Sequence, residues 1–283
     1  IKVSNALLFY DNLKLLNLLN LNGSTFNIPF TVNLKNQIFS SRNKELNINA
    51  QNLKLSIFDE SKKKSADSLT GANIISILNS KIYTNYIIKK NLTLFESDDS
   101  RTKNENINYN GRLSFKPFNL DLNIKLKKYD LSKLIDNNSI ISELIKTKLL
   151  FNENITANFT IDIDTNKNNE IFKSTIINFN LLKGKINLNK SRLINNKIGF
   201  LEIINSNLVF EENKFILKTD IVIEVHDSEE LFSIFQTPKK LRKEVKKILM
   251  NIDYDLSTNQ IYLNNIKVDN LKNNAETKQI IKE

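Results

Sequence analysis

The chain has 283 residues, and its 41 Lys and Arg against 31 Asp and Glu give a formal net charge of +10. It has no Cys and one His, which excludes a disulfide framework, a thiol nucleophile and a multi-histidine metal site. Five Gly leave little room for a phosphate-binding loop, and neither the dinucleotide nor the P-loop pattern occurs. Asn, Ile and Lys are unusually frequent, as expected for a GC-poor genome, so Asn is a poor functional marker here.

Apolar and polar residues alternate along much of the chain, which predicts strands with one apolar face. The clearest runs are at 26–34, 120–126, 155–163, 215–225 and 248–256. Short polar segments at 211–213 and 257–259 predict hairpins, and Asn22-Gly23 is the strongest short turn signal. A parallel sheet would need long crossover connections, which are mostly missing. The sequence therefore predicts a mainly β protein with a long, curved antiparallel meander sheet.

Two segments have helical spacing instead, at about 131–149 and 227–246. The second opens with Asp227 and two Glu residues, which suit the positive end of a helix. Residues 11–20 fit either a helix or a strand, and we favour a strand. We expect solvated loops at 59–70 and 96–106, a single β domain over residues 1–268 and a disordered tail over 269–283.

The apolar strand face must be covered in some way. A second layer would fill it as a β-sandwich core, whereas a single curved sheet would leave it open as a hydrophobic groove. An exposed, continuous apolar strip usually marks a binding surface, and a chain-like apolar molecule such as a lipid acyl tail would fit it. The alternation pattern fits both arrangements equally well.

A basic cluster lies in the C-terminal half of the second helical segment. Its residues suit anionic lipid head groups, and they also suit the solvated end of a helix. We expect no nucleic-acid binding, because the aromatic residues fall on the apolar strand faces and are not interleaved with the basic ones. The possible head-group contacts are Lys239, Lys240, Arg242 and Lys243.

The order of these segments resembles the AsmA-like family of bacterial envelope proteins, the AsmA/TamB/YhdP type. The resemblance rests on LNGSTFNIPFTVNLKN (21–36), GRLSFKPFNLDLNIKLKKYDLSKLIDNNSIISELI (111–145), residues 181–227, and FSIFQTPKKLRKEVKKILMNIDYDLSTNQIYLNNIKVDN (232–270). It covers most of residues 7–270, and about 111–270 correspond to the C-terminal region of the family. The resemblance implies a periplasmic protein anchored in the inner membrane through an N-terminal helix that lies outside these 283 residues.

The family's implied role is to move phospholipid between membranes or to support outer-membrane assembly. We therefore expect a non-enzymatic module without cofactor or metal, whose partners are phospholipid, the envelope membranes and other envelope proteins. The residues expected to line the lipid groove are Phe26, Ile28, Phe30, Leu122, Ile124, Phe159, Ile161, Phe179, Phe215, Ile223 and Ile252.

A second hypothesis is a scaffold with a self-filled β-sandwich core. Such a scaffold would bind protein partners through its edge strands, because open sheet edges favour strand addition.

Overall fold

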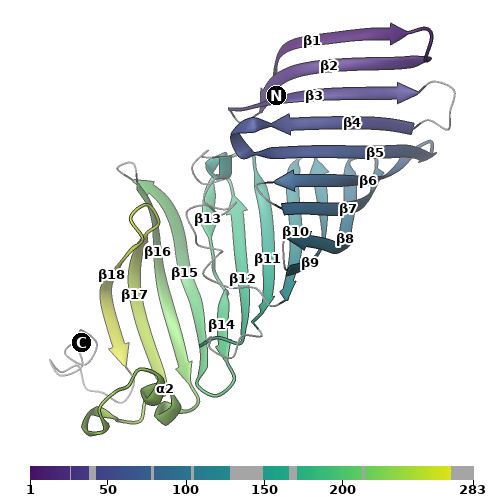
Figure 1. Cartoon of the computed structure of the whole chain (residues 1–283). Coiled ribbons are helices and arrows are strands. Elements are labelled where there is room, and N and C mark those ends of the chain that lie inside the picture. Colours follow the sequence, from purple (N-terminus) through teal and green to yellow (C-terminus); the bar gives the residue numbers. More distant parts are fainter. Residues whose placement is uncertain are drawn as a thin grey trace. The chain divides into compact units, whose positions relative to one another are not determined.

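The computed structural model describes residues 1–25, 27–37, 43–77, 80–102, 105–127, 149–165, 171–211 and 214–268. The strands form one long antiparallel meander sheet of 18 strands (Figure 1), which confirms the predicted fold class. Within these ranges the one α-helix is α2 (Ser228–Ile234), and none of the helical segments described is long and apolar enough to cross a membrane. The chain divides into two compact units, an N-terminal unit (Ile1–Ala157) and a C-terminal unit (Asn158–Glu283).

The N-terminal unit is built from consecutive antiparallel strands joined by short connections. They are β1 (Lys2–Asp11), β2 (Leu16–Thr25), β3 (Ile28–Gln37), β4 (Asn43–Ala50), β5 (Leu55–Ser65), β6 (Ser68–Ile77), β7 (Ser80–Lys89), β8 (Leu92–Thr102), β9 (Glu105–Phe115) and β10 (Phe118–Lys127). Two 3-10 turns accompany them, η1 (Gln51–Leu53) and η3 (Leu149–Phe151). The strand direction turns progressively along this unit, as the right-handed twist of sheets requires (Figure 1).

Strand register gives the N-terminal unit one apolar face. Directly paired residues point to the same side of a sheet, so the pairs can be followed from strand to strand. Val32 pairs with Ile48, Ile48 with Ile57 and Ile57 with Ile75. The same side carries Ile82 of β7, Leu113 of β9 and Leu120 of β10. We call this side the apolar face, and the opposite side, which carries residues such as Asn33, Asn47 and Glu60, the polar face.

Three expectations about connections were wrong in this unit. Asn22 and Gly23 lie inside β2, and the paired ends of β2 and β3 are instead Thr25 and Ile28, next to Asn27 with φ 65°. A Cβ on Gly23 would lie 2.6 Å from the carbonyl oxygen of Lys2, so this Gly allows β1 to approach closely. Segments 59–70 and 96–106 were expected to be loops, but residues 59–65 and 68–70 lie in β5 and β6, and residues 96–102 and 105–106 lie in β8 and β9.

The ambiguous segment 11–20 contains a hairpin. Strand β1 ends at Asp11, and β2 begins at Leu16. The carboxylate of Asp11 accepts hydrogen bonds from the backbone N–H groups of Leu13 and Lys14, both at 3.0 Å, which stabilises the turn. The preference for a strand was therefore correct, although the segment also contains a turn.

The C-terminal unit continues the antiparallel pattern. Its strands are β11 (Thr156–Asp164), β12 (Ser174–Leu182), β13 (Lys185–Asn187), β14 (Arg192–Asn195), β15 (Gly199–Glu211), β16 (Lys214–Val225), β17 (Lys247–Asp255) and β18 (Gln260–Val268). Both β13 and β14 pair with β12 on one side and β15 on the other, so they are two halves of one interrupted strand. The hairpins expected at 211–213 and 257–259 are confirmed.

Side chains take over hydrogen bonding where this strand is interrupted. Leu188 N–H donates to Ser206 Oγ at 2.7 Å, and Ser206 N–H donates to Asn189 Oδ1 at 2.6 Å. Asn178 N–H donates to Ser191 Oγ at 2.9 Å. Because buried backbone groups need partners, these contacts allow the sheet to continue across the break.

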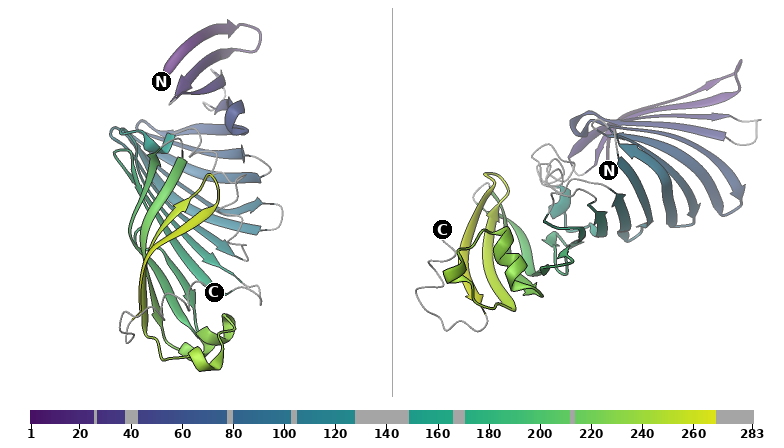
Figure 2. Two further views of the ribbon diagram at one scale, coloured as in Figure 1. Left: turned by 90° about the vertical axis from the view of Figure 1, so that its left-hand side faces the viewer. Right: turned by 60° about the horizontal axis from the view of Figure 1, so that its bottom comes forward.

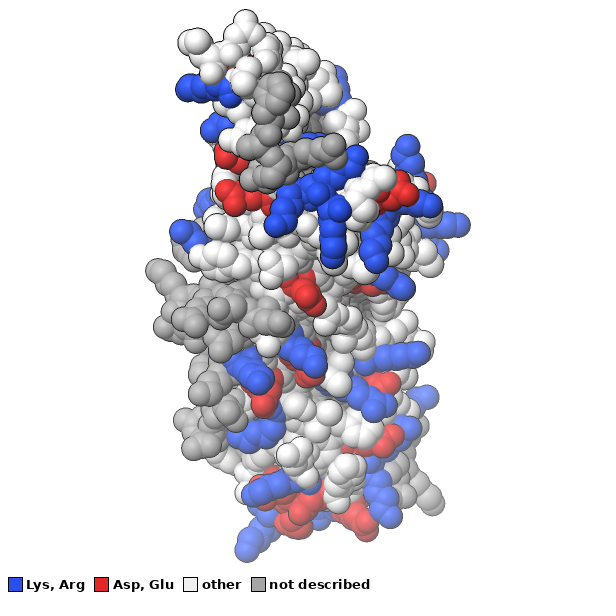
Figure 3. Space-filling model, turned by 90° about the vertical axis from the view of Figure 1, so that its right-hand side faces the viewer, with Lys and Arg blue, Asp and Glu red and all other residues white. Residues whose placement is uncertain are grey.

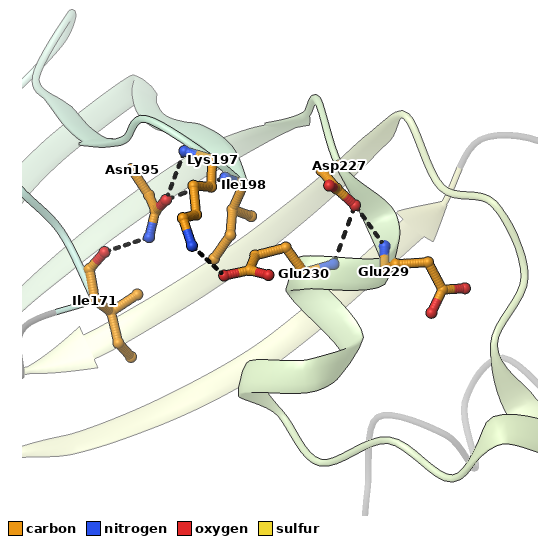
Figure 4. Close-up of polar contacts among 7 residues, drawn as sticks. All are labelled: Ile171, Asn195, Lys197, Ile198, Asp227, Glu229 and Glu230. Atoms are coloured by element: carbon orange, nitrogen blue, oxygen red, sulfur yellow. Dashed lines mark hydrogen bonds and ion pairs between the residues drawn. The ribbon is translucent and has the colours of Figure 1, made fainter.

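Helix α2 packs on the end of β15–β17 in the C-terminal unit (Figure 2). Asp227 caps it by accepting from the N–H groups of Glu229 and Glu230 at 2.9 and 3.0 Å, and Lys197 contacts Glu230 at 3.3 Å (Figure 4). Leu231 and Val245 are buried there in a small core with Ile198 and Val225.

The expected helical segments are only partly matched. Helix α2 ends at Ile234, much earlier than the predicted end at 246, and a 3-10 turn, η4 (Lys239–Leu241), follows. The helix ends in a Schellman motif, in which Gln236 has φ 52° and the N–H of Thr237 donates to the carbonyl oxygen of Phe232 at 2.9 Å. Residues 131–148 of the other expected helix lie outside the described residues, as does the tail 269–283.

Leu231→Ala should lower the free energy of unfolding by about 2–4 kcal/mol, because it removes a buried side chain from the core between α2 and the sheet. Urea denaturation monitored by circular dichroism measures this. Ser233→Ala, at an exposed position of the same helix, is the control and should change stability little. Equal effects of the two changes would show that α2 is not held by this core.

Candidate functional site

The apolar face of the N-terminal unit is the principal candidate site. The buried side chains of β2–β10 that the structure describes all lie on it: Ile28, Ala50, Asp59, Thr84, Thr93, Ser97 and Leu126. Most other apolar residues on this face are only partly buried. The described strands belong to a single sheet, so no second described sheet packs over this face.

The predicted groove residues of the N-terminal unit share this face. Ile28 is buried, Phe30 stands two residues further along β3, and Leu122 and Ile124 occupy the same side of β10. Phe26 lies outside the described residues. Sequence alternation therefore placed four of these five residues on one surface.

The predicted residues of the C-terminal unit share that unit's own apolar face. Phe215, Ile223 and Ile252 are on one side of β16 and β17, opposite Lys218, Asp220 and Asp253. The rings of Phe159 and Phe179 meet with centroids 5.9 Å apart, and Ile161 is buried two residues beyond Phe159. One end of this face is covered by α2, whereas Ile261 and Leu263 of β18 remain exposed.

Two glycines on the apolar face lie under aromatic rings. Gly71 is paired with Tyr86, and a Cβ there would lie 2.3 Å from the Tyr86 hydroxyl oxygen. Gly111 is paired with Phe95, and a Cβ there would lie 2.5 Å from its Cζ atom. Each ring therefore covers backbone that a side chain would otherwise shield, an arrangement that compensates for glycine in a strand.

A row of polar side chains crosses the apolar face at mid-strand. We call Asp59, Asn73, Thr84, Ser97 and Tyr109 the polar row. Asp59, Asn73 and Thr84 are direct cross-strand neighbours, and the hydroxyls of Thr84 and Tyr109 hydrogen bond to each other. Tyr109 also donates to the backbone oxygen of Tyr83 at 3.3 Å. Asn73 Oδ1 is buried and accepts no hydrogen bond from the described residues.

Asp59 and Tyr86 form a hydrogen-bonded ionisable pair on this face. The Tyr86 hydroxyl donates to Asp59 Oδ2 at 2.8 Å. Burial raises the pKa of Asp59, and the hydrogen bond from Tyr86 opposes this only in part. Burial also raises the pKa of Tyr86, and the neighbouring Asp59 raises it further. The pair therefore favours proton-bearing forms, as expected for polar groups in an apolar surrounding.

Two hollows in this unit open on the polar face. One, of about 830 Å³, is lined by side chains such as Asn85, Glu96 and Asn110. Another, of about 480 Å³, lies over Thr31, Asn49 and Ser56. In the larger one Arg112 Nε contacts Asp121 Oδ2 at 2.5 Å, so charge is already paired there. These hollows are wide and carry few chemically distinctive groups.

The basic residues proposed as head-group contacts have a mixed environment. Lys239, Lys240 and Lys243 are exposed, but Arg242 is engaged internally. Its Nε donates to the backbone oxygen of Thr237 at 3.0 Å, and its NH1 nitrogen contacts Glu229 at 3.0 Å. Arg242 therefore braces the segment after α2, which sequence reasoning did not foresee.

Sequence reasoning also missed the polar row and the glycine–aromatic pairs. Asp59 follows Leu55 and Ile57 at alternate positions, which is a strand signal, but the charged run DESKKKSADSLT favoured a loop. Pairing of Gly71 with Tyr86 depends on register between strands, which a single sequence does not reveal.

Comparison with known proteins gives no family. No protein-family model matches the chain, and no curated protein matches it significantly. The described residues include no group of three or more His, Asp or Glu side chains that could hold a metal ion. The site must therefore be interpreted from its own geometry.

Gly71→Ala should destabilise the sheet by roughly 1–3 kcal/mol, because the new methyl group would displace the Tyr86 ring and crowd the backbone oxygen of Glu60. Ala72→Ser, at the next, exposed position, is the control. Chemical denaturation measures both, and loss of stability in the control alone would contradict the packing described.

Asp59→Asn should change how stability depends on pH. Because the folded state holds the Asp59 proton more tightly than the unfolded state, wild-type stability falls as pH rises from about 4 through the raised pKa. The variant lacks this loss, and its amide oxygen can still accept from Tyr86. Urea denaturation at a series of pH values should therefore show that the free energy of unfolding of the variant increases relative to that of the wild type as pH rises. The control is Asp67→Asn in the exposed β5–β6 turn, whose profile of stability against pH should run parallel to that of the wild type. A parallel profile for Asp59→Asn as well would refute this role of Asp59.

Proposed function

We propose that the chain is a non-enzymatic lipid-binding module that holds phospholipid acyl chains against its apolar face. The observation that carries the proposal is the continuity of this face across β2–β10, with no second described sheet above it. Removing a methylene group from water is worth about 0.8 kcal/mol. An acyl chain lying across several strands would therefore bind strongly without any specific polar contact.

The biological setting follows from the same proposal. A sheet that carries lipid tails through water suits transport or assembly in the bacterial envelope, as the resemblance to AsmA-like proteins implies. Inner-membrane attachment, periplasmic location and phospholipid as cargo belong to this proposal. The chemistry of β3 and β10 supports it, since nearly all their side chains on this face are Ile, Leu, Val or Phe, although hydroxyl and amide groups such as Ser61, Tyr86 and Thr93 lie on the face outside the polar row.

Adjacent residues of β6 provide a matched test. Ile75 points to the apolar face and Ile74 to the polar face, and both are partly buried. Ile75→Glu would place a carboxylate against bound acyl chains, which is costly in an apolar environment. We expect it to reduce phospholipid bound after purification by tenfold or more, whereas Ile74→Glu should leave it nearly unchanged.

Quantitative lipid extraction and vesicle-to-vesicle transfer measure this effect. Circular dichroism should show that both variants keep the strand content of the wild type. Equal lipid content in the two folded variants, or no lipid in the wild type, would contradict the proposal.

The second candidate function is a scaffold that adds a partner strand at β1. Within the described residues β1 pairs only with β2, and it has apolar residues on both faces, including Leu7 and Leu8 at 56% and 72% exposure. Such a strand favours pairing with another β-strand. A protein that carries no lipid but recruits a partner along β1 would have this function instead.

A further inference from the structure

One edge of the N-terminal unit concentrates lysines. In an antiparallel meander, hairpins after odd-numbered strands lie along one edge of the sheet and those after even-numbered strands along the other. The first edge includes the ends of the β1–β2, β5–β6, β7–β8 and β9–β10 hairpins and the facing ends of β3 and β4. We call its exposed lysines the hairpin rim: Lys14, Lys35, Lys44, Lys62, Lys63, Lys64, Lys89, Lys90 and Lys116.

Neighbouring strands bring part of this rim together. Lys62 and Lys63 pair with Thr70 and Leu69 of β6, which pair in turn with Ile87 and Ile88 of β7, next to Lys89. Strands β1 and β3 point toward the side seen in Figure 3, where basic side chains gather in the upper part of the view. The opposite edge has fewer described lysines in its turns, Lys54 and Lys81, with Lys2 at the start of β1 and Lys125 and Lys127 at the end of β10.

Few acidic groups offset the rim. Asp11 is occupied by the turn amides of Leu13 and Lys14, and Glu45 lies 3.7 Å from Lys35. Asp67 is the remaining acidic residue in the described turns of this edge. In the cluster at 239–243, Arg242 forms an ion pair with Glu229, and Lys239, Lys240 and Lys243 are exposed.

Apolar side chains stand among the rim lysines at the hairpin tips. Leu13 is 96% exposed beside Lys14, and Phe115 is 56% exposed beside Lys116. Leu92 is exposed two residues after Lys90. Exposed Leu and Phe side chains are unfavourable in water. At a membrane surface, the lysines would contact the outer layer of head groups and the apolar tips would enter the acyl chains beneath.

We propose that the hairpin rim docks on a bilayer surface containing anionic phospholipid, with the lysines at the head groups and the tips of Leu13 and Phe115 among the upper acyl chains. This inference rests on the proposed lipid-binding function and adds the place where lipid would pass between a membrane and the apolar face. Charge complementarity and the interleaved apolar tips select this partner over a soluble polyanion.

Vesicle co-sedimentation of the full chain tests the docking. The probes are vesicles of phosphatidylcholine alone and of phosphatidylcholine with phosphatidylglycerol. The triple variant Lys62→Gln, Lys63→Gln, Lys64→Gln should bind the anionic vesicles on the order of 100-fold more weakly, since each lysine near such a surface contributes substantially. The matched triple variant Lys239→Gln, Lys240→Gln, Lys243→Gln loses the same charge and should bind nearly as well as the wild type.

A second variant distinguishes a membrane from a soluble polyanion. Leu13→Ser with Phe115→Ser keeps every charge, so it should weaken vesicle binding and leave binding to heparin unchanged. Equal vesicle binding by the two lysine variants, full binding to phosphatidylcholine alone, or no effect of the Ser changes would overturn the proposal.

The outcome is separable from that of the proposed function. The triple lysine variant keeps every apolar side chain of the apolar face, so it should still carry phospholipid after purification. Vesicle docking by a wild type whose apolar face holds no lipid would refute the lipid-binding function while leaving the docking in place.

Discussion

A single layer of sheet with one apolar side is the constraint on which the rest of the N-terminal unit depends. Alternation along the strands sends most Ile, Leu and Val side chains to one side and most Asn and Glu side chains to the other, and the antiparallel register repeats this from β2 to β10, with exceptions such as Phe58 and Ile74 on the polar face. In a globular domain a second layer would remove that side from water. Here the described strands supply one layer, so the apolar face has the character of an unfilled core.

Several local features keep this layer continuous. The rings of Tyr86 and Phe95 cover the glycines opposite them. Side-chain hydrogen bonds link β5 to β7 through Asp59 and Tyr86, and β7 to β9 through Thr84 and Tyr109. In the C-terminal unit Asp220 accepts from the amide groups of Asn205 and Asn251 at 3.1 and 2.7 Å, which lowers its pKa. Abundant Asn therefore has structural roles across strands as well as reflecting composition.

Much of the fold could be predicted because period-two alternation is a local signal. It placed Ile28 and Ile124 on one face and identified the hairpins near 211–213 and 257–259. Local signals failed where pairing overrides them. Asn22-Gly23 has the sequence of a turn, but Gly23 lies in a strand and allows β1 to approach closely. The lysines of β5 have the sequence of a loop, but pairing with β4 and β6 keeps them in a strand. The hairpin rim and the polar row arise only once strands are in register, so no single segment reveals them.

The central claim is that acyl chains lie on the apolar face, and one fluorescence measurement tests it most directly. The chain has no Trp, so a single introduced Trp is the sole reporter. Ile57 and Phe58 are adjacent in β5 and point to the apolar and polar faces respectively. With phospholipid brominated along its acyl chains, Ile57→Trp should be strongly quenched and Phe58→Trp should not. Equal quenching of both positions, or quenching of neither, would contradict the account.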